Sequence, residues 1–146
     1  MIHMVAATTG MVIVPAIVAG LIIGIYEIIL VHRDVQVPTH RFGHTIHAIV
    51  FSIVACFFSF NVPVLFKLVP VIDSWPIVGS VIGVRILIGL IAAIKIHGVS
   101  AAIKASGIST QGMQETWIHS LLIGLLTGVA PYAWPFLAPV LPSWAK

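Results

Sequence analysis

The chain has 146 residues, with seven Lys and Arg against four Asp and Glu, and a formal net charge of +3. Only 8% of its residues are charged and 60% are hydrophobic, whereas a soluble domain carries roughly 25% charged residues. The composition therefore excludes a soluble globular protein. The few basic residues form no stripe that would neutralise the phosphates of a nucleic acid.

Four apolar stretches follow one another along the chain, at about residues 4–31, 43–66, 75–97 and 115–141. A helix needs about 20 residues to cross the roughly 30 Å hydrocarbon core of a bilayer, and each stretch meets that length. We therefore predict an all-α polytopic membrane protein, a bundle of about four transmembrane helices that forms a single domain in the lipid bilayer.

Glycine and proline mark the first half of the chain. Gly20 and Gly24 in the first stretch have the small-xxx-small spacing that lets another helix approach closely, and Gly79 and Gly83 repeat it further on. Pro63 lacks a backbone N–H and predicts a kink or helix end in the second stretch, followed by a short interfacial helix.

The third stretch is the least regular, because Arg85 and Lys95 bracket only nine apolar residues. We place this span at about residues 76–96, with Arg85 near its middle. Residues 98–114 are more polar and are typical of a helix end followed by a loop. The fourth stretch predicts a helix that does not continue unkinked beyond Pro131.

Four spans place both termini and the central loop on one side of the membrane, and the first and third loops on the other. Basic residues are more numerous on the side of the first and third loops: Arg33, Arg41, Lys95 and Lys104, against Lys67 and Lys146. Cytoplasmic loops are enriched in Lys and Arg. We therefore predict a multi-pass plasma-membrane protein with both termini outside the cytoplasm.

This topology gathers six of the seven histidines at the cytoplasmic face: His32, His40, His44, His47, His97 and His119. Three of them, His40, His44 and His47, share one helix face because they are spaced at i, i+4 and i+7. His97, His119 and Glu115 lie at similar depth, so these side chains are candidate ligands for zinc, copper or iron. Two alternatives stay open: haem held by axial imidazoles from two helices, and interface histidines that only pack or bond to neighbouring groups.

Arg85 and Glu27 are the candidate intramembrane charges, since Lys95 and Glu115 lie near the ends of their stretches. Charges inside a membrane are costly and are functional candidates by default. The guanidinium does not lose its proton, so Arg85 needs acceptors: Glu27, backbone carbonyls at a helix break, a lipid headgroup, or an acid on another subunit. A buried pair that only fixes helix register is the structural alternative.

No Ser-His-Asp, phosphate-loop, dinucleotide or CxxC pattern occurs in the sequence, so we assign no catalytic residue and expect no enzyme activity from this chain alone. Three functions stay open. The first is an accessory subunit of a larger membrane complex, of the respiratory or membrane-metalloenzyme type. The second is a membrane protein that binds a metal or redox cofactor through the histidines. The third is a small oligomeric channel or carrier with Arg85 on its pathway.

Overall fold

The computed structural model describes the backbone of residues 10–34, 38–105 and 116–146, and within them the side chains of 10–30, 32, 45–98 and 116–146. In these ranges the chain is helical and has no β-strand. The longer helices are, in chain order, α1 (Val14–Asp34), α2 (Pro38–Phe60), α3 (Val62–Leu68), α4 (Val81–Ala105) and α5 (Trp117–Leu137). Short 3-10 helices follow α3 and α5: η1 (Pro70–Ser74), η2 (Ala138–Val140) and η3 (Ser143–Ala145).

Two or three segments are long and apolar enough to cross a membrane. Two lie within single helices or their direct continuation, at Val81–Gly98 and Trp117–Val140. The third is the bent pair of α2 and α3, if the two helices count as one span. The apolar part of α1, Val14–Leu30, is 17 residues long and falls short of the other two. Large apolar side chains face outward on α1, α2, α4 and α5, as expected of a surface that meets lipid.

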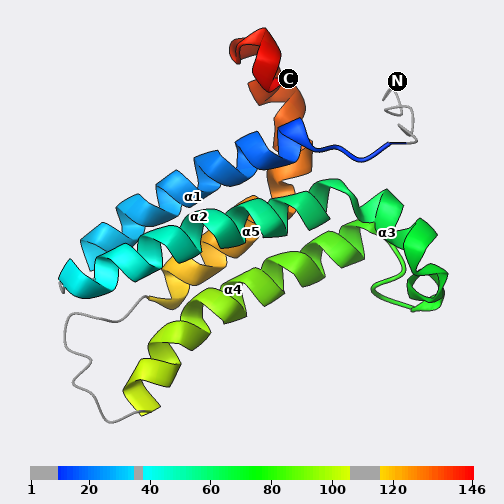
Figure 1. Ribbon diagram of the computed structural model, residues 1–146. Coiled ribbons are helices and arrows are strands. Elements are labelled where there is room, and N and C mark those ends of the chain that lie inside the picture. The colour runs from blue at the N-terminus through cyan, green and yellow to red at the C-terminus, as the bar shows by residue number, and fades with distance from the viewer. Residues whose placement is uncertain (1–9, 35–37, 106–115) are drawn as a thin grey trace.

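Successive long helices run in opposite directions and form two hairpins (Figure 1). Helix α1 packs mainly on α2, and α4 packs mainly on α5, while contacts between the two hairpins are fewer. Many of the core side chains are small, among them Ala16, Ala93, Cys56, Ser59 and Ser120. Small core residues bring helix backbones close together, which is how helices associate in lipid.

Close approach is greatest at glycines. A Cβ on Gly20 would lie 2.5 Å from the Cα of Ile53, so the predicted small-xxx-small face of α1 packs on α2 of the same chain. Gly89 and Gly124 meet in the same way between α4 and α5.

The second glycine pair, at positions 79 and 83, does not serve helix packing. A Cβ on Gly79 would meet the carbonyls of Asp73 and Trp75, and one on Gly83 would meet the carbonyl of Ile77. This pair instead allows the tight turn before α4.

The predicted break at Pro63 is confirmed. Helix α2 ends at Phe60, and the axes of α2 and α3 differ by 71°. Asn61 fills the break: its side-chain amide donates to the carbonyls of Val12, at 3.0 Å, and Phe57, at 2.8 Å. The amide oxygen of Asn61 accepts from the backbone N–H of Val12, at 2.7 Å. The segment before α1 is thereby joined to the end of α2.

Helix α4 begins later than the sequence predicted, at Val81 rather than near residue 75. Residues 75–80 form turns and bends, and the hydroxyl of Ser80 caps the helix by accepting from the N–H of Gly83 at 2.9 Å. Arg85 therefore lies in the second turn of α4, near one end of the bundle. Its predicted place near the middle of the span was wrong.

Helix α5 begins close to its predicted start. Thr116 caps it by accepting from the N–H of His119 at 3.3 Å. The helix continues through Pro131 and Pro135 to Leu137. Its orange C-terminal part runs in a different direction from its gold N-terminal part (Figure 1), which agrees with the predicted kink.

Candidate functional site

The last turns of α1 and α4 and the first turns of α2 and α5 lie toward one end of the bundle (Figure 1). Four histidine side chains are described, each on a different helix: His32 on α1, His47 on α2, His97 on α4 and His119 on α5. The side chains of His40 and His44, and residue Glu115, lie outside the described residues.

The rings of His32, His47 and His97 each contact a nearby side chain or backbone group. His32 is exposed, and its Nδ1 lies 2.8 Å from the carbonyl of Ile28 in the preceding turn. His47 stacks on Phe51, with ring centroids 5.7 Å apart. His97 stacks on Trp117, with centroids 3.8 Å apart, and so joins α4 to the first residue of α5.

The fourth ring, that of His119, is only 2% exposed. Among the described side chains, no group of three or more His, Cys, Asp or Glu is arranged to hold a metal ion. Because three of the six candidate ligands lie outside those side chains, a metal or haem site remains a prediction.

Glu27 is buried, with 3% of its surface exposed, between α1 and α2. Its Oε2 accepts a 2.9 Å hydrogen bond from the hydroxyl of Ser52. This buried hydrogen bond therefore links α1 to α2 within the first hairpin.

Arg85 lies at the opposite end of the bundle from the histidines. Its Nε donates a 3.0 Å hydrogen bond to the carbonyl of Ser59 in the last turn of α2. In a continuous helix this carbonyl would accept from the N–H of residue 63, but that residue is proline and has no N–H. Arg85 therefore supplies the donor that the helix break removes, which is one of the alternatives that the sequence left open.

Tyr132 of α5 covers the same guanidinium. The Cζ of Arg85 lies 4.5 Å from the centre of the Tyr132 ring. A cation over an aromatic face is stabilised by about 0.5–2 kcal/mol, with the larger values where water is excluded. Arg85 thus connects three helices: it belongs to α4, bonds to α2 and contacts α5.

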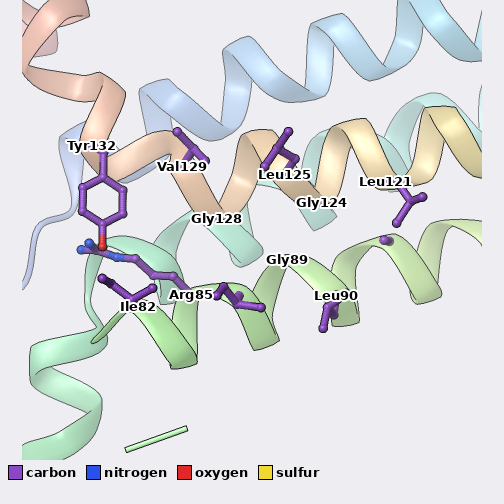
Figure 2. A pocket seen from close by; sticks show the side chains of 12 residues that line it. Ile82, Arg85, Gly89, Leu90, Leu121, Gly124, Leu125, Gly128, Val129 and Tyr132 are labelled. Carbon is purple, nitrogen blue, oxygen red and sulfur yellow. The ribbon is translucent and has the colours of Figure 1, made fainter. Parts of the chain in front are cut away.

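A groove of about 340 Å³ runs between α4 and α5, beginning at this arginine. Figure 2 shows the guanidinium under Tyr132 at the Ile82 end of the groove, with Leu90 and Leu121 toward the other end. Gly89, Gly124 and Gly128 also line it. Apart from Arg85 and the tyrosine hydroxyl, its side chains are apolar.

The guanidinium has more donors than the described protein uses. It carries five N–H groups, and the described residues provide one hydrogen-bond acceptor for them, the carbonyl of Ser59. The site therefore combines a fixed positive charge, spare donors and an apolar channel. Such a combination suits an anion attached to an apolar chain.

Sequence reasoning identified Arg85 but not the groups around it. The carbonyl of Ser59 can be found from the spacing, because it lies four residues before Pro63. Tyr132 and the glycines of the α4–α5 contact carried no such signal, because the pairing of helix faces is a property of the tertiary structure.

Comparison of the chain with protein-family models, curated proteins and solved structures found no match.

Proposed function

We propose that this chain is a non-catalytic subunit of a larger membrane complex, with four transmembrane helices and both termini outside the cytoplasm. The observation that carries the proposal is a groove of about 400 Å³ between α1 and α5, where the two hairpins meet without filling the space between them. A neighbouring helix from another subunit completes this surface.

The composition of the α1–α5 groove supports a protein partner. Ala19, Ala130 and Ala133 line it, and Ile22 and Tyr26 are exposed along it. In lipid, helices associate through close van der Waals packing at small residues. Ala19 and Ala130 form the buried floor of the groove, and the half-buried Ala133 with the exposed Ile22 and Tyr26 offers a surface on which a helix can pack.

The four-span topology is part of the proposal. The apolar part of helix α1, Val14–Leu30, is about 26 Å long at about 1.5 Å per residue, and the apolar residues Met11 and Ile13 precede it, which together approach the roughly 30 Å of the hydrocarbon core. Helix α1 lies along α2 over much of its length (Figure 1). Because α1 lies beside α2, we expect the two helices to lie at the same depth in the membrane. Three basic residues, Arg33, Arg41 and Lys104, lie near the helix ends on the side of the first and third loops, outside the candidate spans, against Lys67 and Lys146 on the other, which supports the cytoplasmic assignment of this end.

Metal or redox-cofactor binding at the histidine end is the alternative function. The candidate ligands that the sequence offers there support it, because imidazole and carboxylate groups bind copper, zinc and iron. Elemental analysis of protein purified without chelators tests it. About one equivalent of copper, zinc or iron, lost in His47→Ala/His119→Ala, would support this alternative.

A carrier with Arg85 on its pathway has less support. Arg85 lies near the end of α4 and already binds Ser59 and Tyr132.

Photo-crosslinking in the native membrane tests the subunit proposal. A photoreactive residue at Ile22, inside the groove, is compared with the same residue at Ile17, exposed on α1 outside the groove. We expect one defined polypeptide to crosslink at position 22 and not at position 17, and Ala133→Leu to abolish the product. Native mass measurement should give an assembly well above 15.6 kDa. A lone, stable chain extracted with its native lipid, and crosslinking to lipid only, would overturn the proposal.

A further inference from the structure

We propose that the groove between α4 and α5 binds one anionic phospholipid, with the headgroup phosphate at Arg85 and one acyl chain along the groove. This site is separate from the α1–α5 groove, and its occupation does not depend on the proposed subunit role.

The first argument is the unused hydrogen-bonding capacity of Arg85. Its guanidinium stays charged at any pH that a protein experiences. Of its five N–H groups, one is matched by an acceptor among the described residues. Donors that the apolar groove and the Tyr132 ring shield from water are costly without an acceptor. A phosphate presents several oxygens and matches the planar fork of an arginine in a bidentate arrangement.

The second argument is depth. Arg85 is the fifth residue of α4, so its Cα lies about 6 Å along the axis from the start of the helix. In Figure 2 its side chain extends away from Leu90, toward the end of the bundle where Ile82 and Tyr132 lie. The positive charge is therefore near the membrane surface, at the level of lipid headgroups, while the groove runs inward from it.

The third argument is length. On α4 the lining residues run from Ile82 to Ala93, and on α5 from Leu121 to Tyr132. At about 1.5 Å per residue each stripe is about 16 Å long, which is about half of the roughly 30 Å hydrocarbon core. The groove thus has the length of one leaflet, the distance over which an acyl chain extends from its headgroup.

The shape of the groove favours an acyl chain over a partner helix. Gly89 and Gly124 already touch, so α4 and α5 are in contact beneath the groove. A Cβ on Gly128 would lie 3.1 Å from the carbonyl of Arg85. The glycines of this groove are therefore already used in the contact between α4 and α5, and a partner helix cannot approach at them.

Native mass spectrometry with defined lipids tests this site. The full chain is reconstituted with phosphatidylglycerol or with phosphatidylcholine of the same acyl chains, and the number of retained lipids is measured. We expect one phosphatidylglycerol to be retained and phosphatidylcholine to be retained less, because its ammonium group offsets the phosphate charge. Inorganic phosphate in large excess should not displace the lipid, because it cannot fill the apolar channel. Displacement would show an anion site without a lipid site and would overturn the proposal.

Three variants make the test specific. Arg85→Gln should weaken retention at least about tenfold, because it removes a charged hydrogen-bond donor. Leu90→Trp, which fills the groove without changing Arg85, should also weaken it. Leu87→Trp is the matched control, since Leu87 is exposed on α4 outside the groove, and it should retain lipid as the wild type does.

Equal retention of both lipids, or wild-type retention by both Arg85→Gln and Leu90→Trp, would overturn the proposal. So would a peptide crosslinked from a photoreactive residue at position 90, because a helix would then occupy the groove. A failure of this kind leaves the subunit proposal standing, because that proposal is tested at Ile22.

Discussion

The Nε of Arg85 lies 3.0 Å from the carbonyl oxygen of Ser59, in the last turn of α2. This carbonyl lies four residues before Pro63, which has no N–H to offer it. The carbonyl exposed at the helix break thus holds the Arg85 side chain in place, and Arg85 supplies the hydrogen bond that this carbonyl lacks. The hydrogen bond gives the Ser59 carbonyl a donor and the Arg85 guanidinium an acceptor. Without a partner, either group would be costly in apolar surroundings.

The first prediction concerns coupling between Arg85 and Pro63. Arg85→Leu should destabilise the protein by about 1–3 kcal/mol, because the Ser59 carbonyl loses its donor. In a Pro63→Ala background the loss should be smaller, because residue 63 can then donate to this carbonyl. Reversible unfolding in mixed detergent micelles, read by circular dichroism, gives the four free energies of the double-mutant cycle. Strictly additive effects would contradict the relationship.

The second prediction isolates the ring of Tyr132. Tyr132→Phe keeps an aromatic face over Arg85 and should change the free energy of unfolding little. Tyr132→Leu removes that face and should cost about 0.5–2 kcal/mol. The same unfolding assay measures both variants. Equal costs for Phe and Leu would show that the ring contributes by packing alone.

The third prediction compares two serines buried in α2. Ser52→Ala removes the hydroxyl that donates to Oε2 of Glu27 and should cost on the order of 1–3 kcal/mol, because a buried acceptor loses this donor. Ser59→Ala should cost less, because among the described residues its hydroxyl has no hydrogen-bond partner. A larger cost for Ser59→Ala would show that the Glu27–Ser52 bond does not stabilise the hairpin.

The fourth prediction concerns Gly20. A Cβ there meets the backbone of Ile53 at 2.5 Å, so Gly20→Ala should push α1 away from α2 and cost about 1–3 kcal/mol. Gly98→Ala is the control, since nothing lies within 4 Å of a Cβ at that position in α4, and the higher helix propensity of alanine should stabilise or leave it unchanged. Disulfide trapping between cysteines placed on α1 and α2 reports whether the two helices move apart, and the unfolding assay reports the change in stability.

Several features of this fold could be predicted from local sequence because their causes are local. Pro63 predicts its own helix break, and the spacing of Gly20 and Gly24 predicts a close helix contact. The start of α4 was misplaced, because residues 75–80 are largely apolar and hydropathy does not detect a turn. The capping residue Ser80 was a signal for the true start.

The candidate site was harder to predict, because its parts come from three helices. Arg85 was identifiable as a membrane charge that needs acceptors, but its depth depended on where α4 begins. Tyr132 contacts it only because α5 packs on α4 at Gly89 and Gly124. The positions of His47 and His97 along their helices could be predicted from the sequence. Their stacking on Phe51 and Trp117 could not, because it depends on side-chain rotamers.

Asn61 has a consequence for movement. It binds both the N–H and the carbonyl of Val12, at 2.7 and 3.0 Å, across 49 residues of sequence. A shift of α1 along α2 by one residue, about 1.5 Å, would break both bonds and carry Gly20 off its contact with Ile53. Piston-like sliding of the first helix is therefore resisted at the end of the hairpin remote from its loop. These bonds do not restrict movement of the two hairpins against each other, which have fewer contacts between them.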